Sequence, residues 1–589
     1  MRLTLAFIVA LAGAIILAVL GTTPPAPRAA PDGFSADAAM RDIRRIARAP
    51  HPSGSAEHAA LRDWLVGRLD GLGMEVRLQR GTFPPDAVRF LNARSGGKAA
   101  SIPLTNIIAV LPGSDRSLPT VALMAHYDSV AGSPAAADDG AGVAAILAVA
   151  ERLAAQEQGR RDLLVILTDG EEAGLSGVRL FFAEADERER IGALINLETR
   201  GGGGKANLFQ TSADNGEVVR TWARSVPHPG GTSLATFIYS VLPNDTDLTV
   251  ALPLGFPAWN FAFIGRPGLY HSPLATADNL DRGALQHMGE QALGLTRALV
   301  DAERLPQPAP DVVFFDVFGL FVVSYAPYWG WVMLAVGTAG FVWSARRGFD
   351  WRAFCAAAGW LVAILAGTGL VLAAVNWLSM GGDAPNYYDR LAAIPRLQAM
   401  AALVCLGGLA LLASRSFASA SRQLGFVLPI GLSAMALQAL APLAAYVLTI
   451  PLLLCGLAAA ARTSLPAIGI VLSVVAGALV GGYALMLGFA LMQAVGPTLP
   501  AVCLLSMALT AMALMPLAPV WPMRRAGAAY LVLTLGAVAI ALWVRLDPIA
   551  PSVPGYAVNE QRASRWALTR KRVSRPSWAR PRDALQDRS

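Results

Sequence analysis

The chain has 589 residues, of which 54% are hydrophobic and 15% are charged. Soluble proteins of this size carry more charge, so the composition excludes an ordinary soluble protein and predicts that much of the chain lies in a membrane. The net charge of +7 does not indicate a nucleic-acid partner, because the excess of basic over acidic residues lies in the connections between apolar segments and near the C-terminus, which is the pattern of cytoplasmic loops.

An apolar segment at residues 1–22 is long enough to span a membrane, and a Pro-rich linker follows at residues 23–33. We expect the apolar segment to be an uncleaved signal anchor that forms a transmembrane helix. Cleavage near Ala29 and Ala30 is the alternative.

Residues 34–306 have the composition of a globular domain, and strand-like and helix-like segments alternate along them. This alternation predicts an α/β fold. The predicted strands are residues 74–78, 105–111, 121–125, 162–168, 193–197, 207–211 and 258–264, and the predicted helices are residues 55–72, 141–153, 176–185, 216–225 and 282–303.

Candidate metal ligands follow the apolar strand at residues 121–125. Open α/β sheets bind their ligands at the carboxyl ends of strands, and His126 and Asp128 lie at that position. His126 can offer a neutral imidazole to a metal, and Asp128 can fix its orientation. Asp138 and Asp139 open the next helix, where carboxylates serve either as metal ligands or only as helix caps. The local chemistry leaves both roles open.

A pair of carboxylates, Glu171 and Glu172, follows the strand at residues 162–168. Adjacent carboxylates at such a strand end are costly unless positive charge holds them. We therefore expect Glu172 to bind a metal and Glu171 to accept a proton from the water that the metal activates. A solvated surface pair is the alternative.

Two more strand ends carry groups of the same kind. Glu198 follows the strand at residues 193–197, and Tyr270 and His271 follow the strand at residues 258–264 after a turn. Each group alone is more typical of protein surface. Four strand ends in one α/β domain that all present metal-binding groups indicate a metal site.

The motifs His-x-Asp, Asp-Asp-Gly-Ala-Gly, Glu-Glu, Asn-Leu-Glu and Tyr-His-Ser occur in this order. This order resembles the zinc-dependent di-metal exopeptidases that include leucine-type aminopeptidases and glutamate carboxypeptidase. A peptidase domain between an N-terminal anchor and many spans resembles the membrane branch of that family, the endoplasmic reticulum metallopeptidase and the vacuolar membrane protease. The resemblance implies a mixed, mostly parallel sheet with helices on both faces, and two zinc ions.

The resemblance also implies a role for each metal ligand. Asp138 would bridge both zinc ions, while Asp139 would shape the turn. One zinc ion would be held by His126 and Glu198, and the other by Glu172 and His271.

Three further residues would take part in the reaction by the same resemblance. Glu171 would be the general base, Asp128 would orient the first histidine, and Tyr270 could stabilise an oxyanion. Arg200 with the glycines at residues 201–204, and the segment at residues 244–247, would line the substrate pocket or form flexible surface loops.

Residues 307–545 are hydrophobic almost throughout and predict an all-α transmembrane domain of about eight helices. Arginine-bearing connections alternate with others, which puts the arginines in the cytoplasm and the peptidase domain outside. The basic tail at residues 546–589 disagrees with nine spans in total, because they would leave it outside. The predicted spans are residues 328–342, 354–378, 397–413, 424–440, 443–461, 465–485, 499–517 and 527–543.

The expected function is that of a membrane-anchored zinc metallopeptidase that removes N-terminal residues from peptides, with carboxypeptidase action as a variant. In a bacterium the peptidase domain would face the periplasm from the inner membrane, and in a eukaryote it would face the vacuolar or endoplasmic reticulum lumen. The alternative is a polytopic transport or assembly protein with an accessory or inactive peptidase-like domain. No ionisable residue lies in the middle of a predicted span, which argues against proton-coupled transport.

Overall fold

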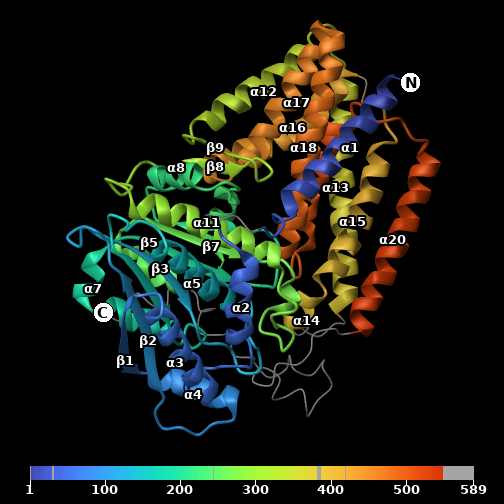
Figure 1. The fold of residues 1–589 in the computed structure, drawn as a ribbon. Helices are drawn as coiled ribbons and strands as arrows, with labels where there is room; N and C mark the ends of the chain where they lie inside the picture. The colour runs from blue at the N-terminus through green and yellow to red at the C-terminus, as the bar shows by residue number, and fades with distance from the viewer. Residues whose placement is uncertain (1, 29–31, 243, 381–386, 418, 548–589) are drawn as a thin grey trace. The chain divides into compact units, whose positions relative to one another are not determined.

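The computed structural model describes residues 2–28, 32–242, 244–380, 387–417 and 419–547 (Figure 1). The chain divides into two compact units, which we call the helical unit and the α/β unit. The helical unit contains the described parts of residues 1–23, 325–384 and 393–549, and the α/β unit contains those of residues 24–324 and 385–392.

One seven-stranded sheet forms the centre of the α/β unit, with the strand order β1-β2-β4-β3-β5-β7-β6. The four neighbouring strands β4, β3, β5 and β7 run parallel, whereas β1, β2 and β6 pair antiparallel at the edges. The predicted α/β class with a mixed sheet is therefore confirmed. The strands are β1 (Glu75–Thr82), β2 (Pro103–Leu111), β3 (Thr120–His126), β4 (Leu163–Thr168), β5 (Ile191–Thr199), β6 (Asn207–Thr211) and β7 (Ala258–Phe263).

Helices cover both faces of this sheet (Figure 1). Successive side chains of a strand point to opposite faces, so Leu123 of β3 packs into the core beneath α5 and α11, while Met124 packs into a second core with α6 and α10. Burial on both faces explains why the central strands are apolar throughout. The helices are α2 (Ala36–Ile46), α3 (Ala56–Asp70), α4 (Pro85–Ser95), α5 (Gly140–Ala154), α6 (Ser176–Ala183), α7 (Ala185–Arg190), α8 (Gly216–Ser225), α9 (Ser233–Val241), α10 (Asp247–Ala251) and α11 (Arg282–Val300).

The α/β unit contains elements beyond those predicted. Its strands β8 (Val313–Asp316) and β9 (Val322–Tyr325) form a two-stranded sheet after residue 306. The six-residue helix α14 (Tyr387–Ala392) also belongs to this unit, although the chain carries it between two helices of the helical unit.

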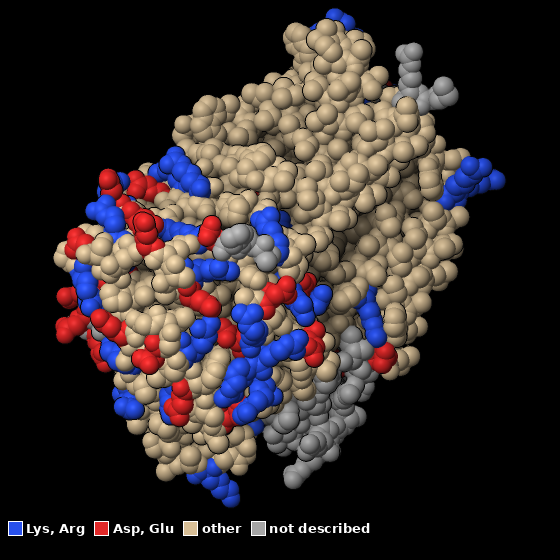
Figure 2. Space-filling model, in the orientation of Figure 1, with Lys and Arg blue, Asp and Glu red and all other residues tan. Residues whose placement is uncertain are grey.

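The helical unit contains a helix at each of the eight predicted spans and at the predicted anchor. Among the described residues, seven helices are long and apolar enough to cross a membrane, while α12 and α19 are shorter. On the face drawn in Figure 2, charged side chains gather over the α/β unit and are rare over these helices. Residues 548–589, which carry the basic side chains of the tail, lie outside the described residues. The helices are α1 (Arg2–Thr22), α12 (Trp329–Ala345), α13 (Trp351–Met380), α15 (Ile394–Leu412), α16 (Ala420–Leu440), α17 (Tyr446–Ser464), α18 (Pro466–Ala494), α19 (Cys503–Leu514) and α20 (Met523–Leu546).

The N-terminal helix α1 packs along α18 through small residues. A Cβ added to Gly481 would lie 3.0 Å from the Cβ of Ala14, and one added to Gly13 would lie 2.9 Å from the Cβ of Ala478. Such small residues allow two membrane helices to approach closely. Ala29 and Ala30 lie outside the described residues, so the uncleaved anchor stays a prediction.

Candidate metal centre

His126 lies at the carboxyl end of β3, the middle strand of the sheet, and only 2% of its surface is exposed. Its Nδ1 lies 3.0 Å from the backbone carbonyl oxygen of Asp128 and 3.4 Å from the carboxylate. The carboxylate instead accepts hydrogen bonds from the backbone N–H groups of Glu171 (3.1 Å) and Glu172 (3.3 Å). Asp128 therefore contacts His126 chiefly through its carbonyl oxygen, and its side chain holds the loop after β4 in place.

Asp138 stands between two histidines that are distant in the sequence. Its Oδ1 lies 3.1 Å from Nε2 of His126, and its Oδ2 lies 3.1 Å from Nε2 of His271. The neighbouring Asp139 is the N-cap of α5, because its carboxylate accepts a hydrogen bond of 3.0 Å from the backbone N–H of Gly142. The two aspartates thus divide the roles that local chemistry left open, one capping the helix and the other facing the histidines.

Two glutamates stand on opposite sides of this centre. Glu198 Oε1 lies 3.7 Å from Nε2 of His126, and Glu172 Oε1 lies 2.9 Å from Nε2 of His271. Together with Asp138, all five side chains are buried, with 2% to 8% of their surface exposed. Each histidine nitrogen therefore faces its own glutamate and one oxygen of the shared aspartate.

The donor set fits divalent metal ions. Ligand atoms of His126, Asp138 and Glu172 lie within 4.8 Å of one another. The buried Oε1 of Glu172 lies 2.9 Å from Nε2 of His271 and has no other polar partner among the residues that the structure describes. Buried carboxylates without a compensating cation are unfavourable, and imidazole nitrogens with carboxylate oxygens suit Zn²⁺. These residues could therefore hold zinc.

The pKa shifts in the centre report an excess of negative charge. Burial lowers the pKa of His271, but the carboxylates of Glu172 and Asp138 outweigh burial and raise it to about 9. Burial and the nearby Asp138 raise the pKa of Glu172 to about 7, although His271 acts in the opposite direction. Both shifts show carboxylates that lack enough positive charge nearby, which is the environment that a metal ion would balance.

Glu171 lies in the loop between β4 and α6, next to Glu172 but outside the ligand pairs. It is 6% exposed and forms no ion pair with a histidine among the described residues. Burial raises its pKa well above the usual range, and the nearby carboxylates of Glu198 and Glu172 act in the same direction. The preceding Gly170 has a φ of +73°, and a Cβ there would lie 2.3 Å from the ring of Phe83, so only glycine fits this turn.

Two tyrosines contact the ring of His271. Tyr270 stacks on it with a centroid distance of 3.8 Å and an interplanar angle of 23°. From α14, the hydroxyl oxygen of Tyr388 lies 3.2 Å from Nδ1 of His271, and Val130 in the loop after β3 packs against Tyr388. Sequence reasoning missed Tyr388, because the residues between the predicted spans 354–378 and 397–413 were interpreted only as a connection. The adjacent tyrosines in this connection were the available signal.

Arg200 and the glycines that follow it lie at the other side of α14. The Arg200 guanidinium donates a hydrogen bond to the hydroxyl of Tyr387. A Cβ on Gly201 would lie 2.2 Å from the carbonyl oxygen of Gly265, so the glycine run packs against the chain after β7. In the segment at residues 244–247, Asp247 is buried and accepts a hydrogen bond from Thr168 at the end of β4. Neither segment is a loosely attached surface loop.

Comparisons with known proteins match part of this chain to peptidases. Curated relatives include the vacuolar membrane protease of Eremothecium gossypii, 30% identical over 311 residues, which are 51% of this chain and 31% of that protein. Human endoplasmic reticulum metallopeptidase 1 is 31% identical over 230 residues, which are 38% of this chain and 25% of that protein. The chain therefore matches less than a third of the length of these relatives.

Solved structures with local similarity include an aminopeptidase from Aneurinibacillus sp. strain AM-1, with 16% identity and a TM-score of 0.36 over 47% of this chain and 98% of that one. A glutaminyl cyclase from Porphyromonas gingivalis has 21% identity and a TM-score of 0.35 over 45% of this chain and 99% of that one. The model of Peptidase family M28 matches residues 106–296, which include every residue of the candidate centre except Tyr388. The chain therefore contains a domain of peptidase family M28.

Proposed function

We propose that this chain is a membrane-anchored, zinc-dependent peptidase that removes N-terminal residues from peptides. The observation that carries the proposal is the arrangement around Asp138, whose two carboxylate oxygens each lie 3.1 Å from Nε2 of a different histidine. A carboxylate that faces two imidazoles in this way suits a bridge between two metal ions. His126 with Glu198 would hold one zinc ion, and His271 with Glu172 would hold the other.

When bound, two zinc ions lower the pKa of a water molecule and polarise the carbonyl group that it attacks. Glu171 would accept the proton of that water, since it lies beside the ligands without belonging to either pair. Asp128 would hold the Glu171 backbone N–H, to which its Oδ1 is hydrogen-bonded at 3.1 Å. Tyr270 would donate a hydrogen bond to the oxyanion that develops on the substrate.

Tyr388 would serve as a positioning residue for His271. A histidine that binds metal through Nε2 carries its proton on Nδ1 and commonly donates it to an outer partner, which fixes the ring. The Tyr388 hydroxyl oxygen, 3.2 Å from Nδ1, is suited to accept that hydrogen bond. Helix α14 would thereby support the metal centre.

The proposed location is a membrane with the α/β unit on the side opposite the cytoplasm, either the periplasm or an organelle lumen. The connections after α12 and α15 carry arginines, which favour the cytoplasm. Both the chain before α12 and the helix α14 belong to the α/β unit, so an even number of crossings separates them. Helix α13 alone would give one crossing, so the even number requires that α12 also crosses the membrane, although α12 has only 17 residues.

The test uses the purified full-length chain and pairs of peptides that differ only in a free or acetylated N-terminus. We expect release of the N-terminal residue from the free peptide alone, loss of activity with a chelator, recovery with Zn²⁺, and close to two zinc ions per chain. Cleavage of the acetylated peptide at its C-terminus would favour a carboxypeptidase. Activity that survives complete removal of metal would refute the zinc mechanism.

A further inference from the structure

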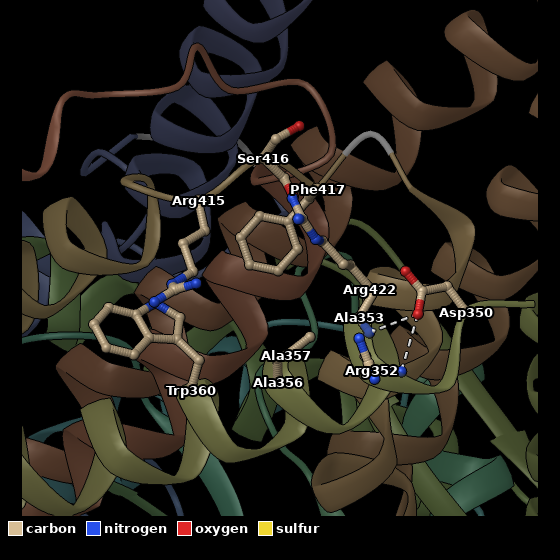
Figure 3. Close-up of a pocket in the computed structure, with 10 residues that line it drawn as sticks. All are labelled: Asp350, Arg352, Ala353, Ala356, Ala357, Trp360, Arg415, Ser416, Phe417 and Arg422. Atoms are coloured by element: carbon tan, nitrogen blue, oxygen red, sulfur yellow. Dashed lines mark hydrogen bonds between the residues drawn. The ribbon is translucent and has the colours of Figure 1, made fainter.

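A second site lies in the helical unit, where the connections α12–α13 and α15–α16 meet (Figure 3). It is a cavity of about 260 Å³ lined by Asp350 and the first part of α13, by the α15–α16 connection and by the first turn of α16. Three arginines and one aspartate line it, namely Arg352, Arg415, Arg422 and Asp350. The cavity is large enough for a group several times the size of a water molecule, which occupies about 30 Å³.

The one aspartate offsets only part of the charge of the three arginines, and it forms no ion pair with them among the described residues. Asp350 Oδ1 accepts hydrogen bonds from the backbone N–H groups of Arg352 (2.9 Å) and Ala353 (3.2 Å), as Figure 3 shows, so it caps α13. Within the described part of the chain, no guanidinium of the three arginines forms an ion pair with a carboxylate. The cavity therefore carries a net positive charge.

Two of the arginines are held by contacts that leave most of their donors available. The Arg415 guanidinium lies over the ring of Trp360 at 4.8 Å from the centroid. Arg422 Nη1 donates to the carbonyl oxygen of Ser416 at 3.2 Å. In Figure 3, Arg415 of the α15–α16 connection and Arg422 of the first turn of α16 lie on either side of the Phe417 ring. A preorganised guanidinium loses less entropy when it binds an anion.

We propose that this cavity binds a phosphate group, and specifically the headgroup of an anionic phospholipid. Guanidinium groups bind phosphate oxygens with paired hydrogen bonds, and a phosphate has enough oxygens to satisfy more than one arginine. Large aromatic side chains stand exposed beside the cavity, with Phe349 50% and Trp351 64% exposed. Aromatic residues of this kind lie at the level of lipid headgroups, and the cytoplasmic side that the arginines favour carries anionic lipids.

The competing explanation is that these arginines only set membrane orientation. In that case any arginine in the same connections would contribute equally to lipid binding. Arg347 provides the matched control, because it is exposed in the α12–α13 connection but does not line the cavity. The two explanations differ in whether position or only charge matters.

The experiment measures lipid binding to the purified full-length chain by native mass spectrometry and by the thermal unfolding midpoint. Phosphatidylglycerol, phosphatidylcholine and inorganic phosphate are titrated separately against the wild type, Arg415→Gln, Arg422→Gln and Arg347→Gln. We expect phosphatidylglycerol to bind the wild type and Arg347→Gln within twofold of each other, and about tenfold more weakly to each cavity variant, as loss of one charged hydrogen bond implies.

Three results would overturn the proposal. Equal weakening in Arg347→Gln and the cavity variants would show general charge attraction. Unchanged binding in Arg415→Gln, which replaces no hydrogen bond within the described protein, would show that the cavity is not the site. Protection by inorganic phosphate at the same concentration as lipid would identify a soluble phosphate compound as the ligand. Unfolding midpoints without lipid separate a lost site from a destabilised fold.

Discussion

Replacement of Tyr388 by phenylalanine tests whether α14 supports the metal centre. The substitution removes only the hydroxyl group, whose oxygen lies 3.2 Å from Nδ1 of His271. The ring remains to pack near His271 and Tyr270, at centroid distances of 5.9 Å and 6.4 Å. Any effect would therefore come from the hydrogen bond and not from lost packing.

The expected loss is about tenfold in zinc affinity. Removing the outer partner of a metal-binding histidine typically costs about 10–100-fold, and the contact here is at the long end of the hydrogen-bond range, which favours the lower value. Tenfold corresponds to about 1.4 kcal/mol. At saturating zinc the reaction rate should change little, because Tyr388 would act by holding the ligand.

The assay measures peptidase activity against buffered free zinc concentrations, together with the zinc content after dialysis. The curve for Tyr388→Phe should move to about tenfold higher zinc with a similar plateau. Tyr387→Phe is the control, because its hydroxyl accepts from Arg200 and contacts no candidate ligand in the described structure. Identical zinc curves for the wild type and Tyr388→Phe would refute the supporting role, as would an equal shift in Tyr387→Phe.

Three further predictions follow from the α/β unit. Glu171→Gln should lower the rate by about 10²–10⁴-fold at unchanged zinc content, and full activity would exclude Glu171 as the base. Gly170→Ala should lower the free energy of unfolding by about 1–3 kcal/mol through the clash with Phe83. Gly96→Ala should cost less, because Gly96 has the same φ of +73° but open space around it. Equal shifts of the unfolding midpoint in the two variants would contradict this. Burial lowers the pKa of His287 to about 3, whereas the pKa in the unfolded chain is about 6.5. The neutral imidazole therefore stabilises the fold fully above pH 6.5. As the pH falls toward 3, the free energy of unfolding should decrease by up to about 1.4 kcal/mol per pH unit. His287→Gln should flatten that dependence of the unfolding midpoint, and an unchanged slope would show that His287 does not titrate there.

The sheet and the ligand strand ends were predictable because their signals are local. An apolar run that ends in His126, or in Glu171 and Glu172, combines a buried strand with groups that burial would penalise unless a site uses them. Helix α2 carried a similar signal that was not used: Ser35 caps it, and its apolar residues recur at helical spacing with Met40 and Ile43 buried.

The remaining features depend on distances that no local pattern encodes. The different roles of Asp138 and Asp139 became clear only from the structure, in which the backbone N–H of Gly142 donates to the carboxylate of Asp139. The contact between Tyr388 and His271 joins positions 117 residues apart, and six residues are too few for a periodic signal. A connection between two membrane helices is typically interpreted as a plain loop, and here that interpretation concealed a contact to a candidate ligand.

Helix α14 also bears on why an M28 domain is joined to so many membrane helices. The α/β unit is interrupted in the chain by α12 and α13 and is resumed only at residues 385–392. If Tyr388 positions His271, the site is complete only when α14 joins the rest of the α/β unit. The chain must then leave this unit through α12 and come back through α13 on the same side of the membrane. An anchor alone would need one crossing. The return of the chain to the α/β unit needs an even number of crossings between residues 324 and 385. The membrane segment would then contribute to the proposed catalytic centre through the path of the chain, and loss of zinc affinity in Tyr388→Phe is the measurement on which that reasoning depends.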